Sequence, residues 1–140
     1  MSAPTPEAPS TVTVTGDTVV APCAVTLADE DVVDILEIAG YGIGYWAAEL
    51  VIHSEFDPPK FGVIEHEGQQ WHERPFSDVR LAFGRLLAHD QKLVGDRLHA
   101  YVQHSVRDAD VDGRPDLGHI DADAADVIVQ VALFGEVVYG

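Results

Sequence analysis

The hydrophobic and polar positions of this 140-residue chain follow two different periods, and the changes from one to the other predict its elements. Apolar residues recur at the helical spacing of three to four positions in four segments: 27–39, 77–88, 90–106 and 122–134. They alternate with polar residues, as strands with one buried face do, in four others: 11–20, 45–53, 61–65 and 69–73. The order of the segments predicts an α+β fold, with about four helices packed on a small, mostly antiparallel sheet.

Polar residues and glycines at the segment ends predict where the helices begin and end. Thr26 and Ser77 precede apolar stripes, where their hydroxyls could accept hydrogen bonds from first-turn amides, and Asp121 stands in the same position before the last helix. Gly40 and Gly135 follow the first and last stripes, as residues that end helices commonly do. The last segment is apolar nearly all round, so we expect it to be the buried central helix.

Turn residues and composition complete the predicted architecture. Gly16-Asp17 and Glu67-Gly68 lie inside alternating runs and favour hairpins. Residues 1–10 contain three prolines and predict a disordered tail. The rest, 11–140, has a length typical of one domain with one core.

The segment IAGYGIGYW (38–46) places three glycines among aromatic residues between a helix and a strand. A phosphate-binding G-x-G-x-x-G loop follows a strand and precedes a helix, so that helix N-terminal amides face the phosphate. The order here is reversed. The segment therefore favours a structural turn, in which Gly40 is left-handed and the next two glycines allow a tight bend.

Two segments of this chain resemble small proteins encoded by bacteriophages of actinobacteria. Those proteins carry a G-G-I-G-Y-W-like segment after the first helix, which is similar to 38–46. They end in A-D-x-I-x-Q-x-A-x-F-G-E-V-V-Y-G, which is similar to ADVIVQVALFGEVVYG (125–140). This chain departs from that segment at Tyr41, which stands between Gly40 and Gly42 where the family has two adjacent glycines. The resemblance brings no established activity, but it implies a phage or prophage accessory protein that binds a host protein or intercepts a host signal molecule.

The charge of the chain narrows the choice of partners. It holds 24 acidic and 8 basic side chains, for a net charge of −16. Such a charge repels nucleic acid and anionic membranes and complements a basic protein, although a soluble surface alone would also account for it. Cys23 has no second cysteine to pair with, and the chain shows neither a signal-like start nor an apolar run of membrane length. These features predict a protein of the host bacterial cytoplasm.

Aromatic residues and a few arginines are the candidates for ligand or partner binding. Three arginines, at positions 74, 80 and 85, follow Trp71 in the sequence, and an aromatic wall beside arginines suits a nucleotide-like ligand or an acidic segment. The alternative is that the aromatic residues form core and the arginines lie on a helix surface. The predicted binding residues are Tyr41, Tyr45, Trp46, Trp71, Arg74 and Arg80.

The segment DADVDGRPD (108–116) reproduces the opening of an EF-hand calcium loop. It offers carboxylates at loop positions 1, 3, 5 and 9, from Asp108, Asp110, Asp112 and Asp116. His119 stands at position 12, where a bidentate glutamate belongs. A calcium site therefore competes with a solvated connection between two helices, in which Asp121 caps the second helix.

The sequence shows no catalytic constellation. The acidic residues beside His66 and His72 could perform acid–base chemistry, but a polar hairpin has the same composition. We therefore expect a non-enzymatic accessory protein that binds and inhibits a host component, possible targets including anti-phage defence. One alternative is a sponge for a nucleotide immune signal, bound in a pocket near Tyr45, Trp46, Trp71 and Arg74. Another is a calcium-binding module. By analogy with other small anti-host proteins, self-association is a further expectation.

Overall fold

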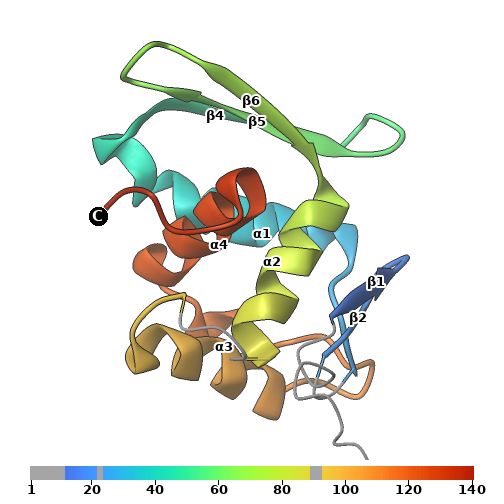
Figure 1. The fold of residues 1–140 in the computed structure, drawn as a ribbon. Helices are drawn as coiled ribbons and strands as arrows, with labels where there is room; N and C mark the ends of the chain where they lie inside the picture. Colours follow the sequence, from blue (N-terminus) through green and yellow to red (C-terminus); the bar gives the residue numbers. More distant parts are fainter. Residues whose placement is uncertain (1–11, 22–23, 89–92) are drawn as a thin grey trace, which may run out of the picture.

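The computed structural model describes residues 12–21, 24–88 and 93–140, in which four α-helices and two antiparallel sheets share one apolar core (Figure 1). The helices are α1 (Asp29–Gly40), α2 (Phe76–Ala88), α3 (Asp96–Arg107) and α4 (Ala122–Phe134). The strands of the first sheet are β1 (Thr13–Thr15), β2 (Thr18–Val20) and β3 (Ala24–Thr26). Those of the second are β4 (Ala47–His53), β5 (Lys60–Glu65) and β6 (Trp71–Pro75). The predicted α+β class is confirmed, with two small sheets in place of one. The predicted tail, 1–10, and Cys23 lie outside the described residues.

Helix α4 is the central element, as its sequence predicts. Every residue from Ala124 to Val131 is buried, and the helix packs against α1, α2, α3 and β6. The Asp121 carboxylate accepts a hydrogen bond from the Ala124 amide at 2.8 Å, and Gly135 ends the helix at φ 78°. Both predicted termini of α4 are therefore confirmed. In Figure 1 the second sheet covers one end of the helical layer, and α3 lies at the other end.

The predicted starts of the other helices are wrong. Thr26 is the last residue of β3, and α1 begins at Asp29, where the Asp31 carboxylate accepts from the Ala28 amide at 2.9 Å. Ser77 lies inside the first turn of α2, because β6 runs directly into that helix at Phe76. Helix α3 begins at Asp96 rather than near 90. Neither α1 nor α2 begins with the hydroxyl cap that was predicted for it.

The second sheet follows the chain order β4-β5-β6, and its β5–β6 hairpin confirms the predicted turn at Glu67-Gly68. Strand β4 begins two residues later than predicted, and its register shifts between Ala47 and Glu49. After the shift, Leu50 pairs with Val63 and Ile52 pairs with Phe61, and both partners on β5 are buried. Leu50 and Ile52 therefore face the helices, while Glu49 and Val51 face away.

The glycines of the 38–46 segment act differently from the prediction. Gly40 is the last residue of α1 and is not left-handed, since the positive φ angles of the described glycines occur elsewhere. A Cβ added at Gly42 would lie 2.9 Å from the carbonyl oxygen of Ala122, whereas one added at Gly44 would meet nothing within 4 Å. Gly42 thus permits the close approach of this turn to the start of α4.

Candidate functional site

The two segments that carry the family resemblance meet in the structure. The Trp46 indole is buried and donates from Nε1 to Asp126 Oδ1 at 2.9 Å, while the Tyr45 hydroxyl donates to Asp126 Oδ2 at 2.6 Å. Gln130, one turn along α4, donates to Asp126 Oδ1 at 2.9 Å. Burial of the hydroxyl and its bond to Asp126 raise the pKa of Tyr45 to about 12.

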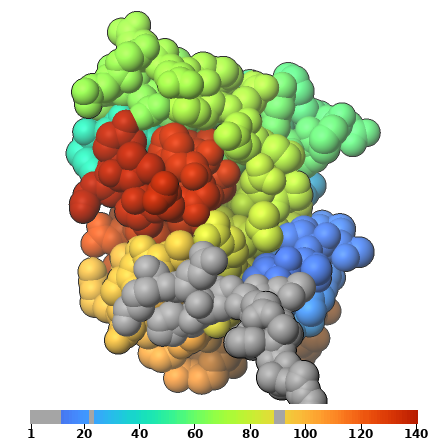
Figure 2. Space-filling model, in the orientation of Figure 1, coloured from blue at the N-terminus to red at the C-terminus, as the bar shows by residue number. Residues whose placement is uncertain are grey.

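The same glutamine holds the C-terminal segment in place. Gln130 Oε1 accepts from the amides of Val138 and Tyr139, both at 2.8 Å. The Tyr139 ring stacks on Trp46 with centroids 5.0 Å apart and planes 7° from parallel, and its hydroxyl donates to Glu65. Figure 2 shows the C-terminal residues, in red, packed directly under the green β5–β6 hairpin. These contacts hold the C-terminal segment against Trp46 and the second sheet.

Of the acid–base residues noted in the sequence, Glu65 and His72 are brought together. His72 Nε2 lies 2.5 Å from Glu65 Oε2. Hydrogen bonds from Tyr139 and His72 lower the pKa of Glu65. His66 lies apart from this pair, with Nε2 2.8 Å from the carbonyl oxygen of Gly44. The Glu65–His72 pair lies within the second sheet, and the Tyr139 hydroxyl joins it to the C-terminal segment.

The predicted aromatic and arginine residues do not form one pocket. Trp46 is 3% exposed and stacked under Tyr139, whereas Trp71 is 42% exposed and lies over Gly62 on the outer face of the second sheet. Arg74 lies three positions after Trp71 on β6, so its side chain points to the opposite, helix-facing side of the sheet. There it donates to the Leu133 carbonyl oxygen at 3.0 Å.

Arg80, another predicted binding residue, is buried. Its guanidinium donates to the Leu27 carbonyl oxygen at 2.7 Å and forms ion pairs with Asp17 and Asp29. It therefore ties α2 to the first sheet and to the start of α1. Further ion pairs with carboxylates of the described residues are formed by Lys60, Arg74, Arg97, Arg107 and Arg114.

A groove of about 830 Å³ lies between α1 and β4. Its apolar lining includes Ile38 and Ile43 from the α1 side and Leu50 and Ile52 from the helix-facing side of β4. Tyr41, directly after α1, also lines the groove and is 89% exposed. Of the predicted binding residues, Tyr41 is thus the one that combines high exposure with a place in this groove.

Three carboxylates border this groove. Asp34 and Glu37 project from α1, and Glu49 from β4. Asp34 and Glu37 are three positions apart and so lie near one another on the helix surface. None of the three forms an ion pair or a side-chain hydrogen bond within the described residues. We call Asp34, Glu37 and Glu49 the acidic rim. The sequence did not indicate this rim, because only tertiary packing places β4 opposite α1.

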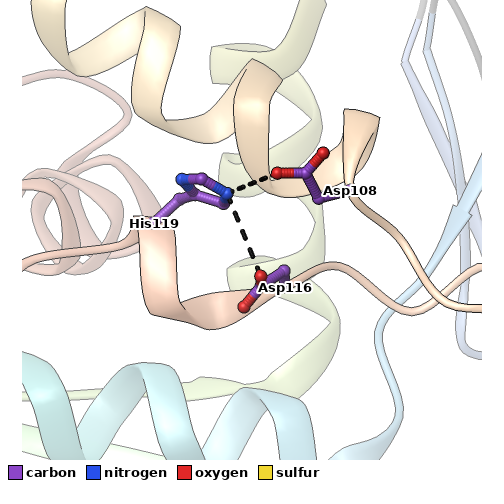
Figure 3. A group of neighbouring side chains, drawn as sticks. All are labelled: Asp108, Asp116 and His119. Atoms are coloured by element: carbon purple, nitrogen blue, oxygen red, sulfur yellow. Dashed lines mark hydrogen bonds and ion pairs between the residues drawn. The ribbon is translucent and has the colours of Figure 1, made fainter.

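The EF-hand-like segment brings two of its predicted ligands together with a histidine (Figure 3). His119 Nε2 lies 2.7 Å from Asp108 and 3.9 Å from Asp116, and one ligand atom from each residue lies within 4.8 Å of the others. Hydrogen bonds from Arg107 and His119 lower the pKa of Asp108. All three side chains are at least partly exposed.

The other two predicted calcium ligands are not in this group. Asp110 Oδ1 accepts from the amides of Asp112 and Arg114, at 2.9 and 3.0 Å, and so closes its own turn. Arg114 forms ion pairs with Glu30 and Asp31, which raise the pKa of the guanidinium and bind this loop to α1. The loop is therefore fixed by its ion pairs with α1, and its four predicted carboxylates do not converge on one point.

No family model, curated protein or solved structure matches this chain. Within the described ranges, no helix has the length and apolar character needed to span a membrane.

Proposed function

We propose that this protein acts without catalysis, by binding a basic segment of a partner protein in the groove between α1 and β4. The acidic rim around an apolar groove is the observation that carries the proposal. The family resemblance extends it: the chain would serve as a phage or prophage accessory protein that inhibits a host component in the bacterial cytoplasm, with anti-phage defence among the targets.

The two parts of the groove have different roles in this proposal. Burial of apolar side chains against Leu50 and Ile52 would supply much of the affinity, since removal of apolar surface from water is favourable. The carboxylates at Asp34, Glu37 and Glu49 would select lysine or arginine, because a neutral or acidic segment leaves them unpaired. The net charge of −16 would also speed the encounter with a basic partner.

The charge arrangement favours a basic segment over the nucleotide signal of the sponge hypothesis. A nucleotide phosphate needs cations or a cluster of amide donors. The arginines considered for that role, Arg74 and Arg80, already bind carboxylates and carbonyl oxygens of this chain. The groove itself presents carboxylates, which repel phosphate. The sponge and the calcium module both stay predictions.

The proposal is tested by capture from an actinobacterial lysate with the full chain and two charge-matched variants. The first, Glu37→Gln/Glu49→Gln, neutralises two rim positions. The second, Glu67→Gln/Asp112→Asn, makes the same charge change at exposed positions away from the groove. We expect wild type and the second variant to retain the same basic protein at ~50 mM salt and to release much of it at ~300 mM.

The Glu37→Gln/Glu49→Gln variant should not retain the captured host protein. After purification, that host protein should lose its activity when the wild-type chain is added. Equal retention by both variants would show that the groove is not the binding surface. An empty wild-type capture at low salt would count against the function as a whole.

A further inference from the structure

We infer that the bound segment is an extended strand, which pairs with the free edge of β4 and enlarges the second sheet. The inference rests on the proposed function and names the conformation and composition of the ligand. Strand β4 stands at one end of the order β4-β5-β6, so one row of its amides and carbonyls has no neighbouring strand within the described ranges. Such a row is a template for a further strand.

The two edges of this sheet differ in how they are protected. The other edge strand, β6, has the sequence WHERP and so carries charged residues and a proline, which are common protections against pairing. Strand β4, AAELVIH, is the longest described strand, with seven residues, and contains no lysine, arginine or proline. After its register shift, Glu49 is the only acidic residue, and it is followed by the apolar run Leu50–Ile52.

The groove includes this edge. Glu49 and Leu50 point to opposite faces of the sheet, yet both line the groove, whereas the next outward residue, Val51, does not. A groove that touches both sides of a strand follows its edge. A strand added there would place alternate side chains against Leu50, Ile52 and the α1 bank, and its backbone against β4.

Charge decides which strand fits. A second copy of this chain would bring a further charge of −16 and another acidic rim to the same edge, and the like charges would repel. A segment of about seven residues, the length of β4, that alternates apolar residues with lysine or arginine would match both the groove and the rim. We therefore assign the edge to a basic, alternating segment of a partner protein.

The test uses the full-length protein and three peptides with acetylated and amidated ends. The first is a heptapeptide of alternating valine and lysine. The other two have the same sequence but are N-methylated at alternate residues, one on the amides of one strand edge and one on the amides of the other. N-methylation removes amide donors and blocks strand pairing but keeps every side chain. Affinity is measured by fluorescence anisotropy, and amide hydrogen exchange is measured along β4. We expect the unmodified peptide to slow exchange at 48–53, and one methylated copy to bind at least about tenfold more weakly. The Glu37→Gln/Glu49→Gln variant should weaken binding, and Glu67→Gln/Asp112→Asn should not.

The possible failures are distinguishable. Binding that depends on Glu37 and Glu49, but is insensitive to both methylated copies and does not protect β4, would overturn the strand inference and leave the proposed function standing. No saturable binding of the unmodified peptide at about 1 mM, a weak affinity by any standard, would overturn both. Sedimentation that shows a dimer with protected β4 amides in the absence of peptide would assign the edge to a second copy and overturn the inference.

Discussion

Asp126 shows how a single residue can join distant parts of this fold. Its carboxylate is 7% exposed and receives hydrogen bonds from Tyr45, Trp46 and Gln130. A buried carboxylate needs such partners, because desolvation without them is expensive. Gln130 also accepts hydrogen bonds from the amides of Val138 and Tyr139, and so links Asp126 to the C-terminal segment. Tyr45, Trp46, Asp126 and Gln130 therefore have a structural role in this chain, apart from any ligand.

The titration of Tyr45 tests this network. Its pKa is raised from 10.0 to about 12, so the folded state holds this proton more tightly than the unfolded state does. The stabilisation is complete below pH 10 and is lost as the pH rises towards 12. We expect the ultraviolet absorbance titration of the folded protein to contain one tyrosine that ionises near pH 12 and is missing from Tyr45→Phe. If the tyrosine that is missing from Tyr45→Phe instead ionises near pH 10 in the wild type, the Tyr45–Asp126 bond is not present in solution.

The two glycines on either side of Ile43 should respond differently to alanine. In Gly42→Ala the new Cβ would lie 2.9 Å from the Ala122 carbonyl oxygen, which is backbone and cannot move aside easily. We expect a loss of about 1–3 kcal/mol in the free energy of unfolding, measured with urea. Gly44→Ala is the matched control, because its Cβ would meet nothing within 4 Å, and it should change stability by less than ~1 kcal/mol. Equal losses in the two variants would contradict the close approach.

At the scale of elements, the structure shows which features a periodic pattern can predict. Helix α4 has the predicted bounds, 122–134, because its stripe, its aspartate cap and its terminal glycine all act locally. The starts of α1 and α2 depend on the strands that lead into them. Sequence reasoning also left Arg80 open between a ligand site and a helix surface, yet it is buried, because Asp17 and Leu27 reach it from the first sheet and its connection to α1.

The candidate site was predictable only in part, for the same reason. Tyr41 could be chosen from its type, but the groove requires α1 and β4 to face each other across a turn whose geometry the sequence did not specify. The carboxylates at Asp34 and Glu37 are also typical of any polar helix face. Their significance depends on the apolar residues that β4 places beside them.

The loop between α3 and α4 gives a prediction on calcium. Calcium usually takes six to eight oxygen ligands, whereas the structure gathers two carboxylates with the His119 imidazole. We expect 1 mM calcium, added after EDTA treatment, to shift the melting temperature by less than ~1 °C, the response of a site far from saturation. A rise of several degrees that is abolished in Asp108→Asn would instead support the calcium interpretation of 108–116.

At the scale of the whole molecule, 24 acidic side chains outnumber 8 basic ones, so most carboxylates cannot each have a cation of their own. Several basic side chains of the described ranges bind acidic partners, and Arg80 and Arg114 thereby connect separate elements. The acidic rim lies outside these pairs. The folded chain therefore keeps unbalanced negative charge beside apolar surface, in a place where a basic partner would relieve the repulsion.

This repulsion should be visible in the free protein. Because 24 acidic side chains face 8 basic ones, added salt should screen more repulsion than attraction. We expect the melting temperature, followed by circular dichroism at pH 7, to rise by several degrees between ~20 and ~500 mM sodium chloride. The Glu37→Gln/Glu49→Gln variant should begin higher at low salt and gain less. A melting temperature that falls with salt would show that the ion pairs, and not the surplus charge, dominate.

The two tryptophans occupy opposite surroundings, and this makes them a pair of built-in optical reporters. Trp46 is 3% exposed in the core, while Trp71 is 42% exposed on the outer sheet face, away from the groove. Acrylamide should quench the emission of the second far more than that of the first. An unlabelled sample can therefore distinguish a ligand that enters beside α1, which leaves the quenchable signal unchanged, from one that covers the outer face of the sheet.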